Sequence, residues 1–482
     1  MTQRETGISW LRSVFYAGRN LLTLTGAALA TSAAFTMLAF WFFEMLRAGP
    51  VPPYTGIVFA LILPAVFLIG LLLVLSGVWR RRRRLRAAGQ LPEIYPQIDF
   101  GNPAIRRTLA WFSVVTFLSV AILSGATYRG VNYMNSVQFC GEVCHTVMAP
   151  EYITYQNSPH SKVACVACHI RSGVPWFVRA KISGVRQVFA VAFHNYPQPI
   201  SLVSAEHVPA RETCERCHWP QKFYGGKLLV RIKYSDDEAN TPLTTVLLLK
   251  LGGRTWEGFP GIHGKHLGEA GRIQYVATDE QRQGIARVTV QGEKGDTVEY
   301  VVKEVERGAE GLSPRESRTM DCTDCHNRPT HPFQMPDRAV DEAMSEGRIS
   351  PTLPFIKKKA LEVLRAEYPD RTTAAQQIAS QLARFYQSSY PEVYATRRAL
   401  LDTVVQQVQA IYLRNVFPEM KISWGTYPDN IGHQDFPGCF RCHDGAHQSA
   451  DGRVIRQDCD TCHDILAMEE SNPAVLEELG IR

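Results

Sequence analysis

Three long apolar runs stand near the beginning of the chain, at Leu21–Leu46, Gly56–Trp79 and Leu109–Tyr128. Each is about as long as the roughly 20 residues that a helix needs to cross the core of a bilayer. Pro64 in the second run is compatible with a membrane helix, because proline there kinks the helix rather than ending it. The first run is too long for a cleaved signal peptide. Residues 1–128 are therefore predicted to form a membrane anchor of three transmembrane helices.

Arginines are distributed unevenly around these runs. Arg80–Arg84 and Arg86, with Arg106 and Arg107, crowd the connection between the second and third runs, whereas the loop after the first run has only Arg47. Loops rich in Arg and Lys stay in the cytoplasm, so the N-terminus and the arginine-rich connection are predicted to be cytoplasmic. The chain after the third run would then lie on the periplasmic side of the inner membrane. A nucleic-acid patch is not expected between two membrane helices.

Residues 222–311 have the pattern of a β-rich insert. Short β-branched runs alternate there with glycines and acidic turns, which favours an antiparallel sheet. These runs are Leu228–Ile232, Thr244–Leu251, Ile273–Ala277, Ala286–Val290 and Val298–Val302.

A helical segment is predicted over residues 337–427. Apolar residues recur there at three- and four-residue spacing, in Ala360–Ala366, Thr373–Tyr386 and Val393–Val416. Prolines mark the boundaries of the predicted helices. They are Pro351, Pro354, Pro369 and Pro391.

All 12 cysteines belong to motifs that end in histidine. Five motifs read Cys-x-x-Cys-His, and the first has three residues between its cysteines. The cysteines are Cys140, Cys144, Cys165, Cys168, Cys214, Cys217, Cys322, Cys325, Cys439, Cys442, Cys459 and Cys462. The motif histidines are His145, His169, His218, His326, His443 and His463.

This is the pattern by which c-type haem is attached. Two thiols add to the two vinyl groups of one porphyrin, and the adjacent histidine binds the iron. A single motif would also suit a zinc half-site or a redox dithiol. Repetition of the motif with no cysteine left over predicts six covalently attached haem c groups, one of them at an unusual Cys-x-x-x-Cys-His site.

The expected fold is three transmembrane α-helices followed by a haem-packed, mostly α-helical or irregular periplasmic multihaem domain. This domain would comprise a triple-haem region at 129–221, the β-rich insert, the fourth haem motif at 312–336, the helical segment, and a C-terminal dihaem region at 428–482. In the periplasm, cysteines that were not attached to haem would be oxidised to disulfides. We expect the haems to hold these regions together and the haem-free chain to be disordered around each motif.

The chain has 14 histidines, so eight lie outside the motifs. Haems that only transfer electrons usually have both axial positions filled, and several of these eight are therefore expected to be distal ligands. The candidates are His160, His331, His433 and His447, with one of the pair His263 and His266. For His194 and His207 a surface or core position is favoured. Spacing does not tell which haem each candidate serves.

The first haem differs from the others, because Met148 follows His145 by three residues. A methionine ligand would raise the reduction potential of this haem, although a methionine in an apolar stretch also serves simply for packing. The first motif lies only a few residues after the third apolar run. This haem is therefore expected at the membrane surface, where it can take electrons from a lipid-soluble quinol.

A membrane helix, a haem motif followed closely by methionine, and the segments Tyr152–His169 and Pro175–Lys181 resemble the NapC/NirT family of membrane-anchored multihaem quinol dehydrogenases. The resemblance continues at Asp321–His331. It implies that Met148 can replace the motif histidine as an iron ligand, and that Lys181 lies near the quinol.

Two positions bear on proton release from the quinol. Family members tend to carry a carboxylate about two turns after the lysine, where this chain has Gln187. Glu142, in the unusual spacer of the first motif, is a possible substitute, although a solvated glutamate is the simpler interpretation.

The added membrane spans, β insert and dihaem tail resemble the larger ImcH-like inner-membrane cytochromes. The resemblance implies a quinol:cytochrome c oxidoreductase that oxidises menaquinol or ubiquinol and reduces a periplasmic cytochrome or another redox protein. One alternative is a terminal multihaem reductase with an open iron position. The other is an electron-relay subunit of a larger membrane complex.

Overall fold

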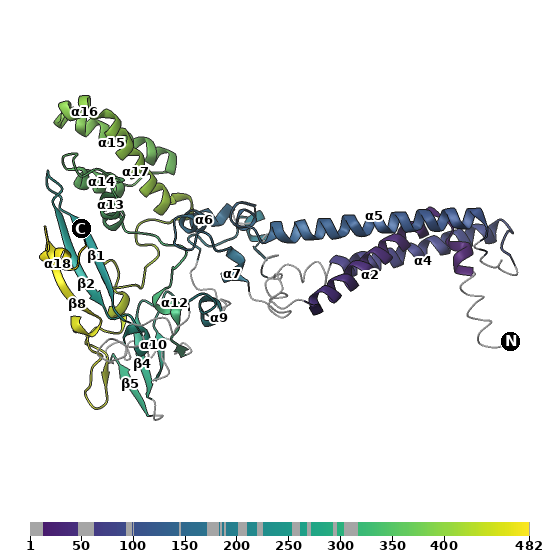
Figure 1. Ribbon diagram of the computed structural model, residues 1–482, viewed down its shortest axis with the longest axis horizontal. Coiled ribbons are helices and arrows are strands. Elements are labelled where there is room, and N and C mark those ends of the chain that lie inside the picture. The colour runs from purple at the N-terminus through teal and green to yellow at the C-terminus, as the bar shows by residue number, and fades with distance from the viewer. Residues whose placement is uncertain are drawn as a thin grey trace. The chain divides into compact units, whose positions relative to one another are not determined.

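The computed structural model describes residues 13–46, 62–92, 99, 101–143, 146–170, 183, 186–187, 189–200, 210–218, 225–252, 261–267, 271–292, 296–302 and 317–481. The chain divides into two compact units. Unit 1 consists of Met1–Cys144 and Ala164–Val188, and unit 2 consists of His145–Val163 and Phe189–Arg482. Figure 1 shows their helices and strands.

Unit 1 is built on α2 (Leu21–Leu46), α4 (Leu63–Ala87) and α5 (Pro103–Met134). All three are long and apolar enough to cross a membrane, as the apolar runs predict. Of the second predicted run, residues 56–61 lie outside the described residues. Two helices extend beyond their predicted ends, and the arginines after Trp79 continue α4 instead of lying in the connection. Arginine is a good helix former, so an apolar run underestimates the length of such a helix.

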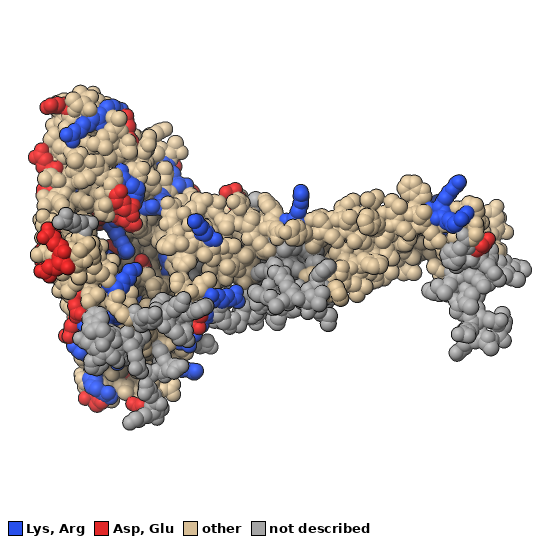
Figure 2. All heavy atoms as spheres, in the orientation of Figure 1, with Lys and Arg blue, Asp and Glu red and all other residues tan. Residues whose placement is uncertain are grey.

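Helices α2 and α4 pack through small residues. A Cβ atom on Gly26 would lie 2.6 Å from the carbonyl oxygen of Gly70, and one on Gly70 would lie 2.7 Å from the nitrogen of Ala30. Close backbone approach of this kind is typical of helix pairs in membranes. Ser32 Oγ of α2 donates to the carbonyl oxygen of Thr116 in α5 over 3.2 Å. Figure 2 shows almost no charge along the middle of this bundle and a group of basic side chains at one end.

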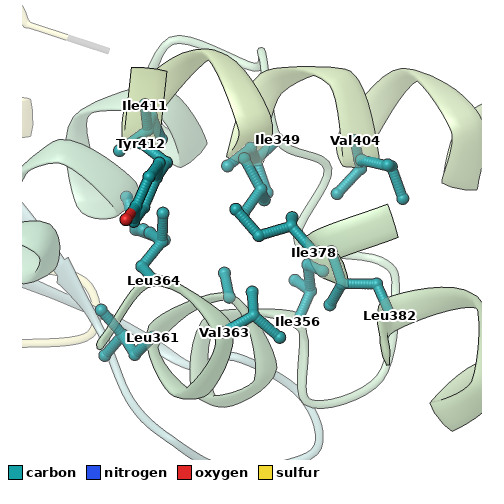
Figure 3. Close-up of a cluster of buried hydrophobic side chains, with 14 of the residues drawn as sticks. Ile349, Ile356, Leu361, Val363, Leu364, Ile378, Leu382, Val404, Ile411 and Tyr412 are labelled. Atoms are coloured by element: carbon teal, nitrogen blue, oxygen red, sulfur yellow. The ribbon is translucent and has the colours of Figure 1, made fainter. Parts of the chain in front are cut away.

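The helical segment of unit 2 comprises α13 (Pro336–Ser345), α14 (Ile356–Arg365), α15 (Arg371–Ser389), α16 (Pro391–Thr396) and α17 (Arg398–Asn415). Its helices enclose the most extensive buried apolar cluster of unit 2, part of which appears in Figure 3. Pro391 occupies the first turn of α16, as the boundary prediction requires. The predicted run Val393–Val416 is divided between α16 and α17 at Arg397.

Two antiparallel sheets contain the predicted strands. The first has the order β1-β2-β8, with β1 at Lys227–Tyr234, β2 at Pro242–Leu249 and β8 at His463–Glu470. The second has the order β6-β3-β4-β5-β7. Its strands are β3 (Gly271–Ala277), β4 (Ile285–Gly292), β5 (Thr297–Val301), β6 (Arg318–Thr319) and β7 (Gln448–Ser449).

The β insert is not self-contained, because β7 and β8 come from the C-terminal dihaem region. Strand β8 begins at His463, the histidine of the last motif, and its first residue pairs with Leu249 at the end of β2. The sheets therefore connect the insert directly to the C-terminal motifs.

The described structure also contains short helical elements, and several of them carry cysteine motifs. In unit 1 they are η2 (Phe139–Val143) and α7 (Cys165–His169). In unit 2 they are η3 (Thr146–Met148), α6 (Ala149–Gln156), α9 (Ala210–Cys214), α10 (Ile262–Leu267), α12 (Cys322–Cys325), η6 (Pro418–Met420), η7 (Gly438–Arg441) and η8 (Cys459–Thr461). A last helix, α18 (Ala474–Glu478), follows β8.

Candidate functional site

The second to the fifth cysteine motifs adopt single helical turns. The backbone nitrogen of His218 donates to the carbonyl oxygen of Cys214 over 2.8 Å, and His326 makes the same bond to Cys322 over 2.8 Å. Residues four apart lie on the same face of such a turn, so each turn presents the first cysteine and the histidine together. Of the predicted site residues, Cys144, His145, Lys181 and His207 lie outside the described residues.

Cysteines of successive motifs lie close together. In unit 1 a hydrogen bond with Cys140 lowers the pKa of the Cys165 thiol to about 7. In unit 2 a hydrogen bond with Cys214 lowers the pKa of the Cys322 thiol to about 7. The structure thus brings the first motif to the second and the third to the fourth.

The last three motifs also adjoin one another. Burial, with a smaller contribution from Cys439, raises the pKa of the Cys325 thiol to about 11. Burial and, to a lesser extent, Cys439 also raise the pKa of Cys462. Motifs three to six therefore follow each other in space in the order of the sequence.

Four motif histidines are each paired with a histidine from outside the motifs. The ring centres of His160 and His218 are 5.9 Å apart, and those of His263 and His326 are 6.3 Å apart. Those of His266 and His443 are 5.9 Å apart, and those of His433 and His463 are 6.3 Å apart.

These separations fit two imidazoles that bind one iron from opposite sides. A metal–imidazole bond is about 2 Å long, so the two ligating nitrogens lie about 4 Å apart and the ring centres about 6 Å apart. Ordinary aromatic packing covers the same range of distances. Packing alone, however, gives no reason why every one of these four pairs should combine a motif histidine with a non-motif histidine.

Hydrogen bonds hold several of these imidazoles in the form that can bind a metal. Five histidine rings, four of them from these pairs, have Nδ1 within hydrogen-bonding distance of a backbone carbonyl oxygen. The pairs are His160 with Pro329 (3.1 Å), His263 with Leu251 (2.7 Å), His266 with Ile262 (2.7 Å), His331 with Glu151 (2.8 Å) and His443 with Arg456 (2.6 Å). An Nδ1–H donor to a carbonyl leaves Nε2 with its lone pair free for a metal.

His331 is held by an ion pair that the sequence did not reveal. Arg328 Nη2 lies 2.8 Å from Glu151 Oε2, and the carboxylate lies 3.3 Å from His331 Nδ1. Burial lowers the pKa of His331 despite this carboxylate. A neutral imidazole with a carbonyl-bound Nδ1 suits the distal-ligand role predicted for His331.

His447 has a different environment from the other candidate ligands. Its side chain is 1% exposed, its Nδ1 lies 3.0 Å from Asp444 Oδ1, and its buried Nε2 has no hydrogen-bond partner. Among the described residues no second imidazole is stacked against it. Ligation by His447 therefore stays a prediction. The side chain of His194, for which a surface or core position was favoured, is exposed.

A hollow of about 300 Å³ opens in unit 2 beside Met148. Its lining includes Val147, Ala149 and Pro150, which flank the methionine in sequence, and it also includes His194 and Glu419. The hollow is thus mainly apolar, and its lining carries three titratable side chains, those of His194, Tyr196 and Glu419. Of the two positions considered for proton release, Glu142 is exposed, and Gln187 Nε2 donates to Ser183 Oγ over 3.3 Å.

Side chains inside two motif spacers connect the fourth motif to its surroundings. Asp324 is 2% exposed and accepts hydrogen bonds from Tyr275 Oη (2.6 Å) and Arg318 Nε (2.8 Å). Arg441, between the cysteines of the fifth motif, donates to the carbonyl oxygen of Asp324 over 2.6 Å. Sequence reasoning missed both residues, because a charged residue in a spacer looks like an ordinary surface position.

The comparisons with known proteins identify the family of the chain. Residues 103–204 match the N-terminal region of the NapC/NirT cytochrome c family, and the chain belongs to that family. It is a membrane-anchored multihaem c-type cytochrome with a role in electron transfer.

A relative covers almost the whole chain. The chain is 40% identical over 476 residues to the cytochrome c-type protein ImcH of Geobacter sulfurreducens, covering 98% of this chain and 91% of that protein. No solved structure matches the chain.

Proposed function

We propose that the protein is a quinol dehydrogenase of the inner membrane that carries six haem c groups. It oxidises menaquinol or ubiquinol and delivers the electrons to a periplasmic cytochrome or another redox protein. The pairing of four motif histidines with four other histidines, at ring separations of 5.9–6.3 Å, carries this proposal. Haem iron with two fixed axial ligands supplies one-electron chemistry with little rearrangement.

The twelve cysteines hold the haems, and the six motif histidines are the proximal ligands. Within unit 2, His160 and His433 are the distal partners of His218 and His463. His331 and Met148 are further ligands, as the family resemblance implies. A terminal reductase needs an open iron position, and the paired imidazoles disfavour one at the third to sixth motifs.

The arginines at the end of α4 orient the protein in the membrane. By the positive-inside rule the N-terminus and the α4–α5 connection are cytoplasmic. Helix α5 then ends on the periplasmic side at Met134, shortly before Cys140. Quinol in the outer part of the bilayer would therefore meet the first haem site, with Lys181 beside it, as the resemblance implies.

Lys181→Ala is expected to lower the rate of quinol oxidation at least 10-fold, because a basic side chain at this position would stabilise the quinol as it loses protons. Reduction of the haems by dithionite should remain as complete as in the natural protein. Stopped-flow mixing of the oxidised protein with a reduced quinone analogue, followed in the haem absorption bands, measures the rate of quinol oxidation, and a separate mixing with dithionite measures the extent of haem reduction. Lys162→Ala, at an exposed position before the second motif, is the matched control. Equal quinol rates for the two variants would refute the role of Lys181.

A further inference from the structure

Helix α10, in the middle of the β insert, carries two histidines three residues apart. The sequence favoured one iron ligand from this pair. In the structure both rings are paired, and each has a different partner. His263 lies against His326 of the fourth motif, and His266 lies against His443 of the fifth.

We propose that α10 supplies the distal axial ligands of two different haems, His263 at the fourth motif and His266 at the fifth. The proposal rests on the haem sites of the proposed function and assigns two of their ligands. Residues three apart on a helix lie on one side of it, with Cβ atoms about 5–6 Å apart. One helical turn would thus hold two neighbouring haem sites at a fixed separation.

Hydrogen bonds prepare both imidazoles for this role. Nδ1 of His263 lies 2.7 Å from the carbonyl oxygen of Leu251, and Nδ1 of His266 lies 2.7 Å from that of Ile262. Each Nε2 is therefore the nitrogen left for the iron.

The helix is fixed to the end of strand β2. The nitrogens of Ile262 and His263 donate to the carbonyl oxygens of Lys250 (2.8 Å) and Leu251 (3.1 Å). A Cβ atom on Gly261 would collide with the carbonyl oxygen of Gly252, so the approach of the two segments requires glycine.

The same strand end also holds the sixth motif. The nitrogen of Lys250 donates to the carbonyl oxygen of Cys462 over 2.9 Å, and its Nζ lies 2.9 Å from Asp464 Oδ1. The segment from Lys250 to His266 thus contacts the fourth, fifth and sixth motifs. The β insert, which has no cysteine of its own, acts as the element that connects them.

The two assignments are distinguishable by electron paramagnetic resonance of the oxidised, haem-loaded full-length protein. Nearly parallel imidazole planes split the iron dπ orbitals strongly and give a rhombic signal, whereas strongly inclined planes give a highly anisotropic one. The planes of His263 and His326 are inclined by 8°, and those of His266 and His443 by 57°. The natural protein is therefore expected to show both classes of signal, and absence of either class would overturn the assignment.

Substitution then identifies each site. His263→Met should remove the equivalent of one haem from the rhombic class, and His266→Met should remove one from the anisotropic class. The double variant should lose both and show two methionine-ligated haems. Lys265→Met, at an exposed position between them, adds a methionine to the same helix without removing an imidazole, and its spectrum should be unchanged.

Intact mass and quinol oxidation are measured on the same samples. Unchanged spectra in both histidine variants, with the number of attached haems retained, would overturn the ligand assignment and leave the proposed function intact. A double variant no different from one single variant would mean that only one of the two histidines binds iron. If the natural protein shows the expected spectra but does not oxidise quinol, the result would count against the proposed function alone.

Discussion

Asp324→Ala is expected to lower the free energy of unfolding of unit 2 by about 3 kcal/mol, because the partly buried guanidinium groups of Arg282 and Arg318 lose a carboxylate partner that is itself buried. Asp324 Oδ1 accepts hydrogen bonds from Tyr275 and Arg318 and lies 3.2 Å from Arg282 Nη1. The two guanidinium groups are about one-third exposed, so water compensates part of the loss and the value falls at the lower end of the range for buried pairs.

The effect should extend to the fifth motif. Arg441 donates to the carbonyl oxygens of Asp324 and Arg282, over 2.6 Å and 2.8 Å. If Asp324 no longer positions Arg282 and its own motif turn, Arg441 loses both acceptors. We therefore expect the fourth and fifth motifs to loosen together.

The measurement is the midpoint of urea unfolding of the haem-loaded protein in detergent, followed by circular dichroism. Asp460→Ala is the matched control, since Asp460 also lies between the cysteines of its motif but is exposed and pairs only loosely with Arg456, at 3.4 Å. Its effect should stay within about 0.5 kcal/mol. Asp324→Asn should fall between the two, because an amide oxygen still accepts from Tyr275. Equal midpoints for Asp324→Ala and Asp460→Ala would show that the buried network contributes no stability.

The membrane helices and the helical segment were predictable because their signals are local. Apolar runs and three- and four-residue periodicity record which face each helix buries. Helix α2 has the predicted bounds, whereas α4 continues into Arg80–Arg84. A hydropathy pattern detects where burial stops, and a helix ends only where its backbone hydrogen bonds stop.

The strands of the insert were predictable from the sequence, whereas the strands that complete the two sheets were not. Five strands of the insert follow β-branched runs, but β7 and β8 are contributed by the C-terminal region. Strand pairing between segments far apart in the sequence depends on the fold of everything between them. The residues from His463 to Glu470 therefore carried no local sign that they would join β2.

In the haem motifs too, local features were predictable and contacts between distant segments were not. The attachment motifs can be recognised from the spacing of cysteine and histidine, because covalent attachment of one haem needs both thiols and the imidazole within a short stretch of the chain. The histidines outside the motifs are brought to them by folding, so neither the pairing of His160 with His218 nor that of His266 with His443 was available from the sequence. Both histidines of α10 are paired with motif histidines, where sequence reasoning expected one ligand.

Preventing haem attachment is expected to unfold part of unit 2 and spare another part. Around the motifs the described residues form only small apolar clusters, such as that of Tyr275, Ile285 and Val288. The helical segment has its own extensive core, in which Ile378, Leu382 and other side chains are fully buried. Small metal-dependent regions fold only with their metal, whereas a helical core of this size is held by burial of apolar surface.

The experiment is limited proteolysis of the full-length chain in which all the motif cysteines are replaced by serine. Cleavage in residues 210–218, 317–331 and 428–463 should become at least 10-fold faster than in the haem-loaded protein. Cleavage within α13–α17 should change little, because this segment does not depend on the haems for its core. Peptides identified by mass spectrometry report both regions in one digest. Equal protection of the motif regions with and without haem would mean that the polypeptide folds there unaided, while loss of protection in α13–α17 would mean that the helical core depends on the haem-bound part of unit 2.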